Sequence, residues 1–108
     1  MSYKIELTDN FKKEAKKLIK KYASLRSEIV ALGKALSKNP TLGTSLGNDV
    51  YKIRLAIDSK NKGKSGGARV ISFIKIIDKT VFLLSIYNKG EKDSISDSEI
   101  KELLKEYL

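Results

Sequence analysis

The sequence predicts a single α+β domain with a mostly antiparallel four-stranded sheet, and with an N-terminal helical hairpin and a C-terminal helix packed against one face of that sheet. Three observations predict this class. The length of 108 residues fits one domain. Stretches that alternate apolar and polar residues, as strands do, stand near the start and in the second half. Stretches with apolar residues at helical spacing lie between them and at the end, so the expected order is β-α-α-β-β-β-α over residues 1–108.

The N-terminal part begins with a strand and continues as two helices. Residues 3–7, YKIEL, alternate apolar and polar side chains, and Thr8 or Asp9 can then cap a helix. Two apolar stripes follow in close succession, which predicts an αα-hairpin that ends before Asn39-Pro40. The stripes are Phe11, Ala15, Leu18 and Tyr22, then Leu25, Ile29, Leu32 and Leu36. The segment 41–49 is expected to be a loop.

Three further strands are expected after this loop. Residues 50–57, VYKIRLAI, alternate, so that the side chains of Tyr51 and Ile53 should face the core beneath the helices. Residues 68–77 and 80–87 are apolar on both faces, as central strands are. The two residues between these strands predict a tight hairpin turn.

The last element is expected to be a helix over residues 96–107. The stretch Ser96-Asp97-Ser98-Glu99 has the form of a capping box, in which a serine and a glutamate satisfy the first free amides of a helix. Behind it, apolar residues recur at helical spacing, namely Ile100, Leu103, Leu104 and Tyr107.

The composition excludes several kinds of chemistry. The chain has no cysteine and no histidine, which excludes disulfides, thiolate or imidazole metal sites and every His-dependent catalytic triad. An enzyme made from this chain must move protons with Lys, Tyr, Asp or Glu. No apolar run approaches the roughly 20 residues that a membrane helix needs. No signal-peptide pattern is visible either, so we expect the cytoplasm.

The positive charge is concentrated in the middle of the chain. The net charge is +9, and residues 51–75 carry seven basic residues against one acidic residue, Asp58. Such a segment indicates a polyanionic partner, such as nucleic acid, or an acidic protein. The alternative is a surface that is charged only for solubility.

Three cations are expected to lie close together on the sheet face away from the helices. Lys52 and Arg54 are two residues apart on one strand and therefore point to the same side. Arg69 opens the neighbouring strand and can lie beside them. Cations without an intervening acid repel one another, so a bound phosphate explains the cluster better than a solvated surface does. Arginine suits this role because its planar fork can hold a phosphate through two hydrogen bonds.

The segment DSKNKGKSGG, residues 58–67, adds Lys60, Lys62 and Lys64, together with Gly63, Gly66 and Gly67. The glycines permit a turn whose amides bind an anion, although the spacing is not that of a phosphate-binding P-loop. A soluble hairpin tip is the alternative. We expect these lysines to contact phosphates of a nucleic acid without taking part in catalysis.

More charged residues follow the last predicted strand. Lys89 or Lys92 can reach a phosphate at the cationic face. Glu91 can orient a lysine or act as a base, but a charged linker is the simpler interpretation of both Glu91 and Asp93.

Few aromatic side chains are available to stack on bases. Phe73 and Tyr87 are expected to point outward from central strands, where one of them can stack on a base, whereas Phe82 and Tyr51 are expected in the core.

Several of these segments together resemble the RelE/ParE family of bacterial toxin–antitoxin toxins. The YKIRL strand, the KSGGARVI segment and the IYNKGEKDSIS stretch carry the resemblance, which covers essentially the whole chain. The pattern GKSGGxRVI followed by YxKxEKxx(I/L)S is similar to the RelE/HigB-type branch.

The resemblance implies a translation-inhibiting endoribonuclease that cuts mRNA in the ribosomal A site without a metal or cofactor. It implies that the 2′-OH attacks the adjacent phosphate while basic residues stabilise the transition state. The Lys-x-Lys pair of the family falls on Lys52 and Arg54, and its third-strand arginine falls on Arg69. Its basic position after the fourth strand falls on Lys89 or Lys92.

One family position has no clear counterpart. The C-terminal tyrosine of the family is replaced in its neighbourhood by Ser94 and Ser96. We therefore take Lys52 as the candidate for proton exchange, because like charges around a lysine favour its neutral form. Arg69 is the candidate for holding the scissile phosphate.

Three functions are compatible with this sequence. The first is a ribosome-dependent mRNA endonuclease, the second a ParE-like gyrase inhibitor, and the third a nonenzymatic RNA-binding module. In either toxin interpretation we expect a cognate acidic antitoxin that covers the basic face or displaces the last helix, and we expect neither a metal nor a membrane as a partner.

Overall fold

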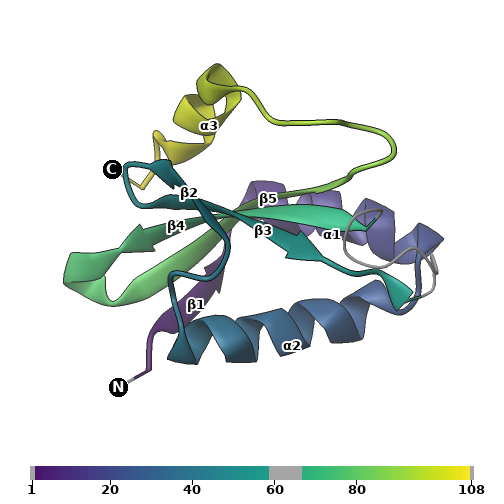
Figure 1. Cartoon of the computed structure of the whole chain (residues 1–108), viewed down its shortest axis with the longest axis horizontal. Coiled ribbons are helices and arrows are strands. Elements are labelled where there is room, and N and C mark those ends of the chain that lie inside the picture. Colours follow the sequence, from purple (N-terminus) through teal and green to yellow (C-terminus); the bar gives the residue numbers. More distant parts are fainter. Residues whose placement is uncertain (1, 59–66, 108) are drawn as a thin grey trace.

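The computed structural model describes residues 2–58 and 67–107, in which helices and strands follow one another as shown in Figure 1. The strands are β1 (Lys4–Leu7), β2 (Thr44–Gly47), β3 (Val50–Leu55), β4 (Ala68–Lys75) and β5 (Thr80–Asn88). The helices are α1 (Asp9–Lys21), α2 (Leu25–Lys38) and α3 (Asp97–Leu104). None of the helices in these ranges is long and apolar enough to cross a membrane.

The strands form one five-stranded sheet in the order β1-β5-β4-β3-β2. Strand β1 runs parallel to β5, and the other neighbours are antiparallel. The predicted α+β class and the mostly antiparallel sheet are confirmed. The strand count is corrected from four to five, because β2 lies within residues 41–49, where a loop was expected.

Strand β2 is an exposed edge strand, and its sequence has no pattern that predicts it. All its residues are exposed, so the strand has no buried face to impose an alternating pattern. Gly43, with φ of +98°, brings the chain onto β3, and a Cβ atom there would lie 2.4 Å from the Lys52 carbonyl oxygen. Asn48 and Asp49 then turn the chain into β3 with positive φ angles of 53° and 64°.

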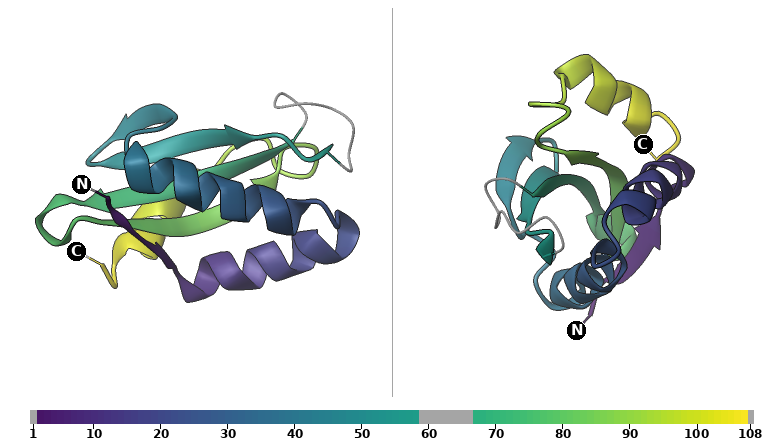
Figure 2. Two further views of the ribbon diagram at one scale, coloured as in Figure 1. Left: turned by 90° about the horizontal axis from the view of Figure 1, so that it is seen from below. Right: turned by 90° about the vertical axis from the view of Figure 1, so that its right-hand side faces the viewer.

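The helices cover both faces of the sheet, which corrects the expectation that they share one face (Figures 1 and 2). The hairpin of α1 and α2 packs on one face through Phe11, Leu25 and Leu36, against strand residues such as Ile53 and Val70. Helix α3 packs on the other face. We call the buried set there the α3-facing cluster: Val50, Ile71, Phe73, Leu84, Tyr87, Ile100 and Leu104.

The expected helix starts are confirmed, while several element ends differ. The Thr8 hydroxyl accepts a hydrogen bond from the Phe11 amide and so caps α1. The Ser96 capping box is present at the start of α3, although α3 ends at Leu104, earlier than predicted. Strand β4 also ends early, and a 3₁₀ turn over Ile76–Asp78 followed by a left-handed Lys79 replaces the predicted tight turn.

A β-bulge in β5 decides which of its side chains face α3. Ile71 and Ser72 of β4 pair with Ser85 and Leu83 of β5, so Leu84 is an extra residue. In a regular strand Leu84 and Tyr87 would point to opposite faces. The bulge brings both into the α3-facing cluster.

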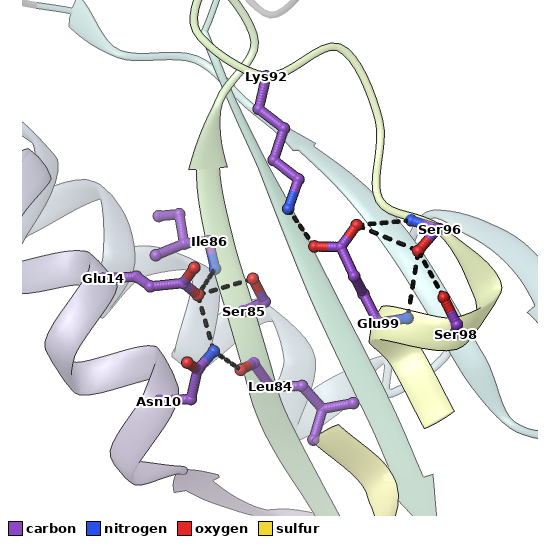
Figure 3. A network of polar contacts seen from close by, with 9 residues as sticks. All are labelled: Asn10, Glu14, Leu84, Ser85, Ile86, Lys92, Ser96, Ser98 and Glu99. Carbon is purple, nitrogen blue, oxygen red and sulfur yellow. Dashed lines mark hydrogen bonds and ion pairs between the residues drawn. The ribbon is translucent and has the colours of Figure 1, made fainter. Parts of the chain in front are cut away.

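The side chain of Glu14 on α1 holds this bulge in place (Figure 3). Its Oε1 atom accepts hydrogen bonds from the Ser85 hydroxyl at 2.7 Å and from the Asn10 amide at 2.8 Å. The backbone amide of Ile86 donates to the same atom at 3.3 Å. Helix α1 thereby fixes the register of β5 after the bulge, where the strand leads to the candidate site.

Candidate functional site

Four cations line one cavity of about 330 Å³ on the α3 side of the sheet. We call it the cationic cleft. Its lining residues are Thr44, Lys52, Arg54, Arg69, Lys89 and Asp93. They come from β2, β3, β4 and the segment after β5, so the sheet itself brings together residues that are far apart in the sequence.

The pairing of three neighbouring strands places these cations. Arg54 of β3 lies directly opposite Arg69 of β4, and Arg69 lies opposite Tyr87 of β5. Lys52 is two residues from Arg54, and Lys89 is two residues from Tyr87, so all of them share one face. The Lys89 amide also donates to the Gly67 carbonyl at 3.0 Å and prolongs the pairing. The predicted proximity of Lys52, Arg54 and Arg69 is confirmed.

Arg69 forms the buried floor of the cationic cleft. Arg69 is 6% exposed, and its Nη1 atom donates a hydrogen bond to the Ala68 carbonyl oxygen at 3.1 Å. Arg54 is exposed and Lys52 is half-buried. A guanidinium fixed between two flanking strands is preorganised, so little ordering is needed when an anion binds.

Lys89 enters the cleft together with a carboxylate, Asp93. The Lys89 Nζ atom lies 2.5 Å from Asp93 Oδ1 and 3.2 Å from the Asp93 carbonyl oxygen. The hydrogen bond from Lys89 and its charge, with a smaller effect of Lys52, hold the pKa of Asp93 below its usual range. The sequence suggested only a charged linker here, because residues after a strand follow no periodic pattern that would predict their direction.

Glu91 and Lys92 make their contacts outside the cationic cleft. Glu91 Oε1 accepts hydrogen bonds from Lys21 Nζ of α1 at 3.1 Å and from the Asn88 side-chain amide at 3.0 Å. Lys92 Nζ lies 2.5 Å from Glu99 Oε2 of α3 (Figure 3). Of the two lysines expected near a phosphate, Lys89 lines the cleft.

Tyr87 lies next to the cleft, beneath Lys92. The residue is 5% exposed, and within the described ranges its hydroxyl has no hydrogen-bond partner. Lys92 Nζ is 5.7 Å from the centre of its ring. Burial raises the pKa of Tyr87, and the positive charges of Arg69, Lys89 and Lys92 oppose this shift. The phenol is therefore protonated at neutral pH.

Phe73 also belongs to the α3-facing cluster. Its ring centre lies 6.3 Å from that of Phe82, which in turn lies 4.7 Å from the ring of Tyr107. In this conformation α3 covers Phe73 and Tyr87, and neither ring is presented to a base. Tyr51 and Phe82, both expected in the core, are half-buried. Tyr51 packs against the core on the hairpin side of the sheet, and Phe82 packs against the α3-facing cluster.

Lys60, Lys62 and Lys64 lie outside the described residues, so their predicted contacts with RNA stay a prediction. Within the cleft, four cations face one carboxylate. Such an arrangement can bind a phosphodiester and stabilise additional negative charge on it.

The family of this chain follows from a comparison with known sequences. Residues 3–107 match the family described as RelE toxin of the RelE / RelB toxin-antitoxin system. The chain belongs to the RelE toxin family. It is therefore a toxin of the type II toxin–antitoxin kind, and the resemblance drawn from its sequence is confirmed.

Solved structures show the same fold. A mutant of the E. coli toxin RelE in the free state superposes with a TM-score of 0.67 at 20% identity, covering 100% of both chains. A chain of the intact E. coli RelBE toxin–antitoxin complex gives 0.62 at 20% identity, covering 81% of this chain and 96% of that one. The isolated E. coli RelE toxin in its P21 crystal form gives 0.52 at 19% identity, covering 99% and 100%.

Proposed function

We propose that this RelE-family chain is a ribosome-dependent endoribonuclease of the RelE/HigB type, which cuts mRNA in the ribosomal A site and so inhibits translation. The observation that carries the proposal is the cationic cleft, in which Lys52, Arg54, Arg69 and Lys89 meet around one cavity. A cluster of this kind suits the one group that every RNA cleavage must handle, the phosphodiester.

The proposed reaction is an attack of the ribose 2′-OH on the adjacent phosphate. The phosphorus forms a bond to the 2′ oxygen and loses its bond to the 5′ oxygen of the next nucleotide. Negative charge then builds up on the other phosphate oxygens, where preorganised donors act most strongly. Arg69 is fixed by its strand and would hold the scissile phosphate, with Arg54 beside it.

Lys52 is our candidate for proton exchange with the reacting oxygens, and Lys89 supplies further positive charge. The scheme uses no metal and no cofactor, because positioning and charge stabilisation alone can supply much of the acceleration. The positions of the four side chains around one cavity support these proposed roles.

Other contacts with RNA are proposed around the cleft. Lys60, Lys62 and Lys64 would contact phosphates of the message or the ribosome. Lys92, Phe73 and Tyr87 would join them only if α3 moved, since Lys92 is paired with Glu99 and both rings lie beneath α3.

A cognate acidic antitoxin is the expected regulator. It would cover the cationic cleft or displace α3, which spans only Asp97–Leu104 and buries Ile100 and Leu104 against the sheet. A ribosome-directed toxin would act in the cytoplasm. If an antitoxin bound equally well after removal of α3, displacement of this helix would be rejected as the mechanism.

Expression of the chain in growing cells, with mapping of mRNA ends, tests the proposal. The wild-type chain should stop growth and produce new mRNA ends within codons, and Arg69→Ala should do neither. A fully toxic Arg69→Ala variant would overturn the site assignment. DNA damage and altered supercoiling without mRNA cleavage would instead identify a gyrase inhibitor, and salt-dependent RNA binding without cleavage would identify a nonenzymatic module.

A further inference from the structure

The cationic cleft contains one carboxylate among the described residues that line it, Asp93. Its side chain is 93% exposed, so its oxygens remain accessible to a substrate. The Lys89 ammonium binds it both through Oδ1 and through the backbone carbonyl. This double contact holds Asp93 against the lysine of its own segment.

The other candidate proton acceptors near the cleft, Glu91, Glu99 and Tyr87, are not among the residues that line it. Glu91 is bound to Lys21 and Asn88, and Glu99 is bound to Lys92 and the start of α3. The phenol of Tyr87 is protonated at neutral pH. The chain contains no histidine. Asp93 is thus the acceptor whose place and protonation state suit the removal of a proton.

We propose that Asp93 is the catalytic base of the cleavage reaction and accepts the proton of the attacking 2′-OH. The inference rests on the proposed function and assigns a further catalytic residue to the same cleft. As the P–O2′ bond forms, the proton passes to Asp93. As the P–O5′ bond breaks, Lys52 gives a proton to the leaving 5′ oxygen. The products are a 2′,3′-cyclic phosphate and a 5′-OH, and both side chains regain their starting states through solvent.

Substrate binding favours this role of Asp93. In the free protein, Lys89 and Lys52 keep the carboxylate ionised, which makes it ready but weakly basic. A bound phosphate brings negative charge next to it and shares the same cations, and both effects raise the basicity of a carboxylate. The cavity of about 330 Å³ corresponds to the volume of about ten water molecules, which leaves room for a phosphate and adjoining sugar atoms.

The titratable groups around Asp93 come from three strands and the segment after β5, while β2 contributes the neutral Thr44. They are Lys52 and Arg54 on β3, Arg69 on β4, Tyr87 on β5 and Lys89 in the following segment. Asp93 is the one carboxylate in this set, so it has no acidic competitor for the proton among the described residues of the cleft.

The test is single-turnover cleavage of mRNA bound to purified ribosomes, as a function of pH. Asp93→Asn should lower the cleavage rate by about 10²-fold or more, the usual contribution of a general base. RNA binding by this variant should be unchanged or tighter, because a negative charge has been removed from the cleft. The residual rate should rise about tenfold per pH unit near neutrality, because hydroxide must then take the proton. The wild-type rate should be nearly independent of pH in the same range.

Two further variants complete the test. Asp93→Glu retains a carboxylate and should restore part of the cleavage rate. Asp78→Asn makes the same chemical change at the β4–β5 turn, where Asp78 pairs with Lys75, and should leave the rate unchanged. If Asp93→Asn cleaved as fast as the wild type with an unaltered pH profile, Asp93 would not be the base. If the wild type itself did not cleave, the proposed function would fail instead.

Discussion

Arg54 and Arg69 lie directly opposite each other in the β3–β4 ladder and line the same cavity. Like charges in this position destabilise a sheet. The two guanidinium groups therefore lower the stability of the free protein, and a bound phosphate is the kind of ligand that would relieve their repulsion.

Replacing Arg54 should stabilise the free protein. Arg54→Gln removes one charge of the pair and should raise the free energy of unfolding in urea by about 0.2–1 kcal/mol. The same variant should bind RNA less tightly. Arg26→Gln on the exposed surface of α2 is the matched control and should change neither quantity appreciably. A clear loss of stability in Arg54→Gln would contradict the view that this pair is repulsive.

The salt dependence of RNA binding should identify the cations that contact phosphate. For single-stranded RNA, each lost phosphate contact reduces the slope of log K against log salt by about 0.7. Lys52→Gln should show this reduction, measured by fluorescence anisotropy over a salt series. Lys38→Gln, at the end of α2 and outside the cleft, should keep the wild-type slope. If Lys52→Gln kept the same slope as Lys38→Gln, Lys52 would not contact an RNA phosphate.

The contact of Lys92 with Glu99 should make the docking of α3 sensitive to acid. The hydrogen bond from Lys92, and then that from the Ser96 amide, hold the pKa of Glu99 below its usual value of 4.5. A group whose pKa is lowered by folding stabilises the folded state above its unfolded pKa, and this contribution is lost as the pH falls through the folded value. The protection factors of the α3 amides against hydrogen exchange should therefore fall at pH values below the usual pKa of a glutamate.

Two variants isolate this pH effect. Glu99→Gln keeps a side chain that can complete a capping box but cannot form the ion pair with Lys92. The protection factors of the α3 amides should therefore be lower at neutral pH and change less on acidification. Lys92→Gln removes the other partner and should behave in the same way. Unchanged exchange in both variants would show that the ion pair does not hold α3.

Removal of Glu14 should destabilise the protein through the β5 bulge. Glu14→Ala leaves the Asn10 and Ser85 side chains and the Ile86 amide without this acceptor. Unpaired buried polar groups cost about 1–3 kcal/mol, which urea unfolding can measure. Glu102→Ala, on the exposed side of α3, should stay within about 0.5 kcal/mol of the wild type. Equal effects of the two changes would rule out a role of Glu14 in fixing the bulge.

Periodic sequence patterns predicted most of the fold and the central part of the site. Alternation along residues 50–57 placed Lys52 and Arg54 on one face, and the order of strands placed Arg69 beside them. Such patterns report which side of an element is buried, so they also found the hairpin of α1 and α2 and the capping box at Ser96.

Features that depend on tertiary contacts were not predictable in the same way. The apolar stripe of α3 shows that the helix packs on something, but not on which face of the sheet. The extra residue Leu84 leaves no mark in the apolar run of β5, although it turns Tyr87 toward α3. Asp93 follows the strand in a stretch without periodicity, so only the contact with Lys89 reveals its place.

The most direct test of the central claim is cleavage of ribosome-bound mRNA by purified protein with and without Arg69. The wild type should produce 2′,3′-cyclic phosphate ends, and Arg69→Ala should be slower by about 10²-fold or more. Arg69→Lys retains the charge at this buried position and serves as a control for folding, but its single ammonium should not restore the full rate. Equal rates for the wild type and a folded Arg69→Ala variant, or an absence of cleavage by the wild type, would contradict the account.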